Sequence, residues 1–185
     1  MSQYRPRKKI YRLIYEGNNK TERTFFQHLF HKSSYVPVDA LPLSPKTDPK
    51  SLYQFGIDEI KRLGLSKQLG DRVFIIMDLD HRIDHKKYVS SHAQTNKLIV
   101  FVPSQPCIEA FFLLHFVELK NFDMTGDEVI AALKEHIQNY DKSLDVFSRL
   151  DGQNEIACAR LRKLAKQFRI RGTITIPDLI DLLKK

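Results

Sequence analysis

The sequence predicts an α/β protein in which a small, mainly parallel sheet is flanked by helices and followed by a helical C-terminal extension. Two short apolar runs, residues 72–77 and 98–102, are typical of strands buried on both faces of a parallel sheet. Strand-like and helix-like segments alternate up to about residue 117, as crossover connections between parallel strands require. The length of 185 residues fits one domain with an extension and excludes two large domains.

The first part of the chain supplies two strands and two helices to this prediction. Residues 9–15 are rich in β-branched and aromatic side chains and run into a polar turn, so they predict a strand. Thr21 then opens a helix with phenylalanines at helical spacing, and residues 51–65 carry a second apolar stripe. Between these helices, residues 35–50 contain four prolines, which permit only an edge strand followed by a loop.

The strand at residues 72–77 is followed by the polar residues 81–96, which are expected to form a connection to the strand at 98–102. Pro106 stands where the first turn of a helix tolerates proline, and the apolar residues after it predict a buried helix. Further helices are expected at residues 126–139, 141–150 and 153–169, and after the capping residue Thr175. The expected division is a core over residues 1–120 and a helical extension over residues 121–185, packed on that core.

The composition favours a polyanionic partner. The chain has 30 Lys and Arg residues against 22 Asp and Glu residues, which gives a formal net charge of +8 and a pI near 9.4. Two cysteines without a metal-binding spacing exclude a disulfide framework. No apolar run approaches the roughly 20 residues of a membrane span, so we expect a cytoplasmic protein without a membrane partner.

Acidic residues follow three of the predicted strands. Ligands of an open α/β sheet bind beyond the carboxyl ends of its strands, and this rule gathers Glu16, Asp78, Asp80 and Glu109. Alternate residues of a strand share a face, so the two aspartates are expected to project together, about 6.5 to 7 Å apart. Four carboxylates in one crevice would repel one another, and a bound Mg²⁺ or Mn²⁺ would resolve that conflict because hard cations take oxygen ligands. The alternative interpretation is that these residues are loop starts or helix caps.

The acidic residues stand in longer sequence strings: Glu16-Gly17 followed by Lys20-Thr21-Glu22, then Asp78-Leu79-Asp80-His81, then residues 104–109 running into residues 113–116. These strings resemble the RloB family of TOPRIM-fold proteins. The resemblance continues through residues 140–142, 154–164 and 175–183, so it covers nearly the whole chain. The string from Pro106 through Glu109 to Phe116 is its most specific element.

This resemblance implies a TOPRIM-like, metal-dependent catalytic core. Such proteins are similar to ones encoded beside restriction and antiphage defence loci, often next to a partner ATPase of the ABC type. By position, Glu16 corresponds to the TOPRIM glutamate, Asp78 and Asp80 to the metal-binding aspartates, and Glu109 to an acidic residue of the nuclease-like branch. The turn after Glu16 is one residue longer than the usual turn of the family, which affects the placing of Lys20.

The reaction suggested by the resemblance is hydrolysis of phosphodiester bonds in RNA or DNA, with Mg²⁺ or Mn²⁺ as cofactor. Glu16 would bind metal or act as general base, and the two aspartates would hold metal. Glu109 would support a second ion or orient the attacking water. Lys142 or Lys20 would stabilise the charge that develops in the transition state.

A basic stretch near the C-terminus is the candidate nucleic-acid-binding surface. No acidic residue lies between Glu155 and Asp178, and apolar residues at helical spacing would form the opposite stripe. The stretch is either a solvated helix face or a patch that binds a nucleic-acid backbone, to which Lys20 would contribute. Its basic residues are Arg160, Arg162, Lys163, Lys166, Arg169 and Arg171.

Three further features of the sequence have both a functional and a structural interpretation. His81 and His85 could form a zinc site with Asp84, although such a pair in a polar loop is typically exposed to solvent. His115 is expected to pack or to cap rather than to catalyse, because it lies off the helical face of the candidate carboxylate. Cys107 is expected to be a buried structural thiol.

Two other functions stay open from the sequence. A haloacid-dehalogenase-like phosphatase also uses an Asp-x-Asp motif after a buried strand, with the first aspartate as nucleophile. Against it, the motif follows two earlier elements, and Glu16 and Glu109 would have no role. The other alternative is a non-catalytic nucleic-acid-binding regulatory subunit whose carboxylates only bind metal.

Overall fold

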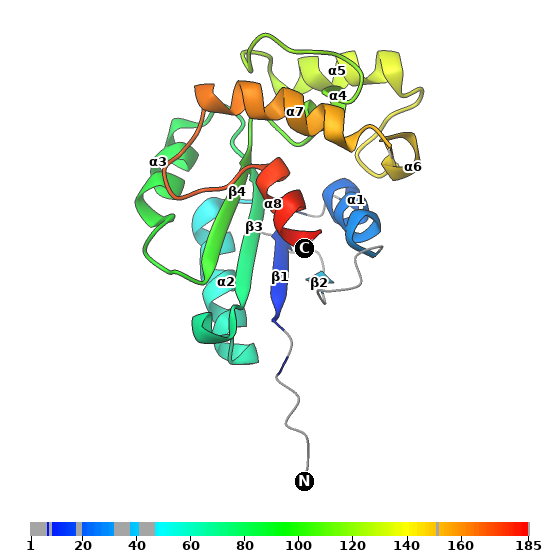
Figure 1. Ribbon diagram of the computed structural model, residues 1–185. Helices are drawn as coiled ribbons and strands as arrows, with labels where there is room; N and C mark the ends of the chain where they lie inside the picture. The colour runs from blue at the N-terminus through cyan, green and yellow to red at the C-terminus, as the bar shows by residue number, and fades with distance from the viewer. Residues whose placement is uncertain are drawn as a thin grey trace.

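The computed structural model describes residues 7, 9–17, 20–31, 38–40, 47–150 and 152–184. Its centre is a four-stranded, fully parallel sheet with the strand order β2-β1-β3-β4 (Figure 1). The strands are β1 (Tyr11–Tyr15), β2 (Val38–Ala40), β3 (Arg72–Asp78) and β4 (Ile99–Ser104). The α/β prediction is confirmed, and the proline-rich segment supplies the short edge strand β2.

Both faces of the sheet are buried, which explains the continuous apolar runs in the sequence. On β3, Phe74 and Ile76 belong to one hydrophobic cluster, while Val73 and Ile75 belong to a second. Successive residues of a strand point to opposite faces, so the two clusters are the two sides of one sheet. Each side needs its own helical cover.

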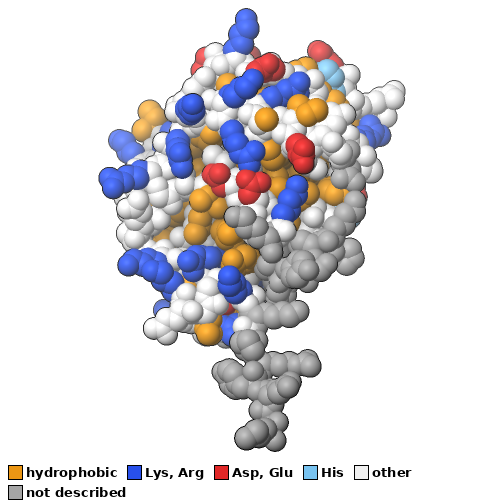
Figure 2. Space-filling view, viewed as in Figure 1, with side chains coloured by type: hydrophobic (Ala, Val, Ile, Leu, Met, Phe, Trp, Pro, Cys, Tyr) orange, Lys and Arg blue, Asp and Glu red, His pale blue; other side chains and the backbone are white. Residues whose placement is uncertain are grey.

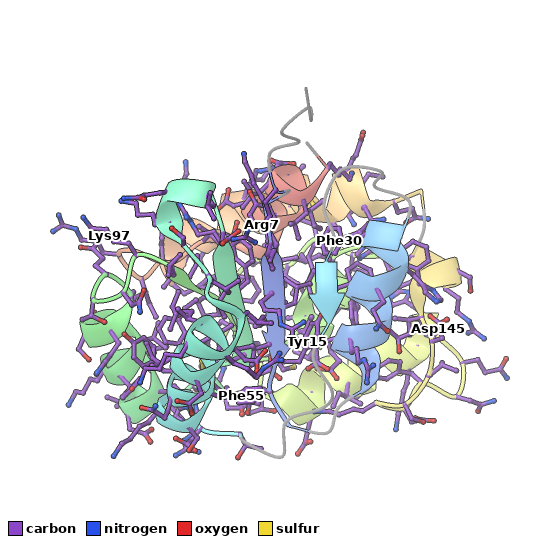
Figure 3. All side chains as sticks on the ribbon, turned by 90° about the horizontal axis from the view of Figure 1, so that it is seen from below. Arg7, Tyr15, Phe30, Phe55, Lys97 and Asp145 are labelled. Atoms are coloured by element: carbon purple, nitrogen blue, oxygen red, sulfur yellow. The ribbon has the colours of Figure 1, made fainter. Side chains whose placement is uncertain are left out.

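Helices cover the two faces in the order that right-handed crossovers dictate. Helix α2 (Pro49–Leu63) and helix α3 (Ile83–His92) pack on one face, with Leu52 and Val89 in its cluster. Helix α1 (Lys20–His31) and the last helix, α8 (Ile176–Leu183), contribute to the cluster on the other face. Figure 3, which looks from below, shows α2 and α8 on opposite sides of the sheet.

The remaining helices extend beyond the carboxyl ends of the strands, at the top of Figure 1. They share one hydrophobic cluster with the sheet, so residues after 120 pack against the core. Thr125 and Thr175 each form a capping box at a helix start, as expected for the second of them. The elements are α4 (Glu109–Leu113), α5 (Gly126–His136), α6 (Phe147–Leu150), α7 (Asn154–Leu164) and the 3₁₀ helix η2 (Ala165–Gln167); a further 3₁₀ turn, η1 (Lys67–Leu69), precedes β3.

Two expected elements differ from the structure. The polar residues 81–96 are not a plain connection, because they contain α3; its described buried side chains are only His85 and Val89, too few for a clear apolar period. The helix expected at residues 141–150 is reduced to α6. The Asp141 carboxylate accepts hydrogen bonds from the amide and hydroxyl of Ser143, which favours a turn over a helix there.

None of the helices in the described part of the chain combines the length and the apolar character that a membrane crossing requires.

Candidate functional site

The carboxyl ends of β1 and β3 meet through a carboxylate. Glu16 directly follows β1, and its Oε2 atom accepts a hydrogen bond of 2.8 Å from the backbone amide of Asp78 at the end of β3. The Asp78 side chain is only 8% exposed, and its Oδ1 atom accepts a 2.9 Å hydrogen bond from the amide of Ile108. Three strand ends are therefore tied together, because Ile108 lies in the segment that follows β4.

Glu109 closes the site from the first turn of α4. Its side chain is 2% exposed, its Oε1 atom accepts a 3.0 Å hydrogen bond from the Tyr140 hydroxyl, and the Lys142 ammonium lies 3.9 Å from the same oxygen. The Oε2 atom of Glu109 is buried and has no hydrogen-bond partner within the described residues. One oxygen of this carboxylate is thus held in place, while the other is buried without a partner among the described residues.

Glu22 is a member of the site that was not proposed from the sequence. It lies in the first turn of α1, is 4% exposed, and has a buried Oε2 atom without a partner in the described chain. A carboxylate in the first turn of a helix ordinarily interacts with the helix dipole at the surface, which concealed its role. The available signal was the string Lys20-Thr21-Glu22, in which only Lys20 was given a function.

The carboxylates raise one another's pKa. Burial, followed by the negative charges of Glu22, Glu109, Glu16 and Asp80, raises the pKa of Asp78 well above its usual range. Burial raises the pKa of Glu16 to about 7, against the hydrogen bond from the Asp78 amide, and the charge of Asp80 adds to the increase. Burial, with a smaller increase from Glu109, raises the pKa of Glu22 to about 8. Fully ionised, these carboxylates would carry more negative charge than the nearby described cations neutralise, and the raised pKa values mean that Glu16 and Glu22 partly hold protons near neutral pH.

Lys142 is the cation that counters this charge from the helical layer. Its charge lowers the pKa of both Glu16 and Glu22, and its side chain is 44% exposed. Although burial opposes the change, the charges of Glu109 and Asp78 raise the pKa of Lys142. The Thr21 hydroxyl donates a hydrogen bond to the Lys142 carbonyl and so anchors this segment to the start of α1.

Asp80 does not project from β3 beside Asp78, contrary to the strand-based expectation. The strand ends at Asp78, and Asp80 and His81 have positive φ angles of 46° and 57°, in the left-handed region. This turn takes the Asp80 side chain to the surface, while its amide donates a 2.9 Å hydrogen bond to the Pro106 carbonyl. Two successive non-glycine residues in this region cost about 1–2 kcal/mol each, a strain typical of functional sites.

The donor chemistry of the site fits a hard divalent cation. Carboxylate oxygens are the ligands that Mg²⁺ and Mn²⁺ prefer, and Glu22 and Glu109 each present a buried oxygen without a partner among the described residues. Within the described part of the chain, however, no three His, Cys, Asp or Glu side chains already converge closely enough to hold an ion. A bound cation would therefore require side-chain rotation as well as the charges already in place.

The predicted basic stretch divides into two parts. Along α7, Arg160 donates a 2.7 Å hydrogen bond to the Leu114 carbonyl, and Arg162 forms a 2.5 Å ion pair with Asp181. Lys163 lies 3.1 Å from a Glu118 oxygen. The remaining members Lys166, Arg169 and Arg171 are exposed beyond α7, and the Lys20 backbone begins α1 while its side chain lies outside the described residues.

His81, His115 and Cys107 have structural explanations, whereas both ring nitrogens of His85 are buried without a partner among the described residues. His81 hydrogen bonds to the Met124 carbonyl and to the Gln105 side chain, at 2.9 and 2.7 Å. His85 is buried, so the expectation of an exposed loop residue is wrong for it. His115 is buried and contacts the carbonyls of α4, as a capping residue does. Cys107 is a buried free thiol whose pKa is raised by burial, as expected.

Comparison with known protein families gives a match over most of the chain. The model of the RloB-like protein family matches residues 11–180, which include β1, the acidic residues and most of α8. Curated proteins and solved structures gave no match when each set was searched. Because the match spans far more than half of its length, the chain belongs to the RloB-like protein family.

Proposed function

We propose that this protein is a Mg²⁺- or Mn²⁺-dependent nuclease that hydrolyses phosphodiester bonds in RNA or DNA. The observation that carries the proposal is the group of carboxylates that raise the pKa of Asp78 at the carboxyl ends of the strands. A buried group of acids without neutralising cations is destabilising unless it serves a ligand. A divalent cation with a phosphate group supplies both the positive charge and a substrate for chemistry.

The residues divide into roles according to their environment. Asp78, Glu109 and Glu22 are the deepest carboxylates and would hold the cation, while exposed Asp80 would approach it from the surface side. When bound, a divalent cation polarises a phosphate and lowers the pKa of a bound water. Glu16, whose pKa is raised to about 7, is suited to accept a proton from the attacking water near neutral pH.

Lys142 would act on the phosphate itself. Its ammonium is half-exposed at the edge of the acidic group, where it can contact a non-bridging phosphate oxygen and remain beside Glu109. A fixed cation at that position stabilises negative charge that develops on the phosphate during cleavage. The carboxylates would thus hold the cation and the water, and Lys142 would hold the substrate.

The test is cleavage of labelled single-stranded and duplex RNA and DNA by the purified protein with Mg²⁺ or Mn²⁺. We expect cleavage by the native protein, loss of cleavage with Asp78→Ala, and normal cleavage with Glu135→Gln, which removes an exposed carboxylate from α5. Unchanged cleavage by Asp78→Ala would refute the assignment. Cleavage of p-nitrophenyl phosphate through a phospho-aspartate would instead identify a phosphatase.

The resemblance to the RloB family also suggests antiphage defence with an ABC-type partner ATPase. The assay should therefore be repeated with such an ATPase encoded beside the gene and with ATP. Cleavage that appears only in its presence would support a regulated nuclease. Binding of nucleic acid without turnover under all these conditions would identify a regulatory subunit and refute the catalytic proposal.

A further inference from the structure

A basic groove lies between α3 and the segment that follows η2, outside the acidic group. It has a volume of about 530 Å³ and is lined mainly by long cationic and small polar side chains. Figure 2 shows Lys and Arg side chains gathered on the left of the view, where α3 lies in Figure 1. The residues that matter here are Lys86, Lys87, Ser90 and Ser91 from α3, with Arg169 and Arg171 from the facing segment.

The groove has four cations and no carboxylate in its lining. None of the four forms an ion pair with a carboxylate within the described residues, whereas Arg162 and Lys163 on α7 are both paired. Four like charges around one groove repel one another, and a polyanion relieves that repulsion. The Ser90 hydroxyl adds a neutral hydrogen-bond donor of the kind that contacts phosphate oxygens, whereas the Ser91 hydroxyl donates to the Tyr88 carbonyl within α3.

The arginine side of the groove is fixed to the core. Gly172 has a φ angle of +87°, and a Cβ atom there would lie only 2.6 Å from the Gln94 side chain just after α3. The Thr173 hydroxyl donates a 2.8 Å hydrogen bond to the Ile170 carbonyl, and the next amide, of Ile174, donates to the Phe101 carbonyl in β4. The spacing between the two cationic walls is therefore set by the fold.

The groove starts beside the acidic group. Helix α3 begins at Ile83, which lines the groove and stands three residues after Asp80. The preceding residue, Arg82, has a raised pKa because of its hydrogen bond with Asp84, and the charges of Asp80 and Glu16 also contribute. Ten helical residues span about 15 Å, which corresponds to about four nucleotides at 3.4 Å per step along one strand.

We propose that this groove binds the sugar-phosphate backbone of the nucleic acid strand next to the bond that is cleaved. The identity of the ligand as a substrate rests on the proposed nuclease function, while backbone binding can be measured without cleavage. Contacts to phosphates carry no sequence information, and no aromatic side chain lines the groove to stack on a base. Binding through the groove is therefore independent of base sequence.

The test measures binding of a fluorescent 20-nucleotide single strand of RNA, and separately of DNA, in EDTA over a range of salt concentrations. Each single-strand phosphate contact contributes about 0.7 to the slope of log affinity against log salt. We expect the double variants Lys86→Ala/Lys87→Ala and Arg169→Ala/Arg171→Ala each to reduce the slope by about 1.4. Equal effects on RNA and DNA would identify the phosphate backbone as the ligand, and an effect on one alone would show which polymer the groove accepts.

The matched control is Lys61→Ala/Lys67→Ala, which removes the same charge from exposed positions near the amino end of β3. We expect this control to keep the native slope, and all three variants to keep the native melting temperature because the side chains are not buried. Native slopes for both groove variants would overturn the proposal, as would tighter binding of poly-glutamate than of nucleic acid. Loss of binding in the groove variants, with no cleavage by the native protein either alone or with the partner ATPase and ATP, would refute only the nuclease assignment.

Discussion

Buried carboxylates lie at both ends of the sheet, and the protein treats them differently at each end. At the amino end, Asp71 is fully buried and accepts hydrogen bonds from the amides of Ser66 and Ile10, both at 2.8 Å. The Arg7 guanidinium lies 2.6 Å from the Oδ2 atom of Asp71. Although burial opposes the change, these bonds lower the pKa of Asp71. Both oxygens of the Asp71 carboxylate therefore have partners within the protein.

Glu59 repeats this arrangement on α2. Arg62 binds its two oxygens at 2.6 and 2.7 Å, and buried Arg12 reaches it from β1 at 2.8 Å. The hydrogen bonds from Arg62, against burial and with help from Arg12, lower the pKa of Glu59. Two cations for one carboxylate make this a structural ion pair between a strand and a helix.

At the carboxyl end of the sheet, the carboxylates outnumber the described cations near them, which is the reverse of the arrangement around Glu59. Asp78, Glu109 and Glu22 are buried like the carboxylates at the amino end, yet within the described residues they share one ion-pairing ammonium, that of Lys142, which lies 3.9 Å from Glu109. The pKa is raised for Asp78 and Glu22 and lowered for the amino-end pair. Burial alone thus does not distinguish a structural acid from a functional one; the number of cations and amides that satisfy it does.

The largest expected effect is on catalysis at the carboxyl end. Glu109→Gln keeps the shape of the side chain and its bond from Tyr140 but removes the charge that would hold a cation. We expect kcat/KM for cleavage to fall about 10³-fold, equivalent to about 4 kcal/mol, with a native or higher melting temperature in the absence of metal. Native kcat/KM across a Mn²⁺ titration would remove Glu109 from the site.

The next effect is on stability at the amino end. Asp71→Ala leaves two buried amides and one guanidinium without their acceptor, so we expect the free energy of unfolding to fall by about 3 kcal/mol. Urea denaturation measures this change, and cleavage per folded molecule should stay native. A loss below about 0.5 kcal/mol would show that the amino-end site contributes little to stability.

The pH dependence of stability should have opposite signs at the two ends. The folded-state pKa of Glu22, raised to about 8, lies above its usual value of 4.5, so the folded protein holds a proton that the unfolded chain has lost. The stabilising contribution is complete below pH 4.5 and is lost as the pH rises through about 8. In metal-free protein, Glu22→Gln should therefore match the native stability near pH 4.5 and exceed it increasingly towards pH 8.5.

Asp71 provides the matched comparison for that experiment. Its pKa is lowered, so its contribution to stability is present above its usual value and is lost as the pH falls through the lower, folded-state value. The stability difference between native protein and Asp71→Asn should shrink towards acid. If both variants instead changed in the same direction with pH, the contrast between the two ends of the sheet would be wrong.

The strands were predictable from sequence because buried parallel strands have a strong local signal. The runs around Phe74 and Phe101 are continuous and apolar on both faces. The proximity of the carboxylates was predictable because ligands of an open α/β sheet bind beyond the carboxyl ends of its strands, a rule that requires no side-chain geometry. Elements that depend on one helix face or one turn were harder to predict from the sequence. Helix α3 is the example, because its described buried side chains are only His85 and Val89.

Parts of the site that depend on three-dimensional context could not be predicted. The sequence gives no sign that Asp80 leaves the strand in a left-handed turn, because its surroundings after β4 impose that turn through the Pro106 carbonyl. Glu22 looked like an ordinary helix-start acid, and its burial depends on distant residues of the helical layer. The basic groove joins Lys86 to Arg169, more than 80 residues apart, so no local pattern could indicate it.

The smallest expected effect concerns Lys142, at the carboxyl end of the sheet. Lys142→Met removes the charge that lowers the pKa of Glu16, so the acid limb of the pH–rate profile should move to higher pH, and the plateau rate should fall about 10-fold to 100-fold. Lys142→Arg keeps the charge and should restore the position of the limb more fully than the rate, because a guanidinium is larger and planar. A purely structural role, through the contact of the Lys142 ammonium with Glu109, would lower the melting temperature but leave the limb where it is. Movement of the limb without loss of stability would therefore show that Lys142 acts by its charge, on carboxylates that the amino end of the sheet would have paired in full.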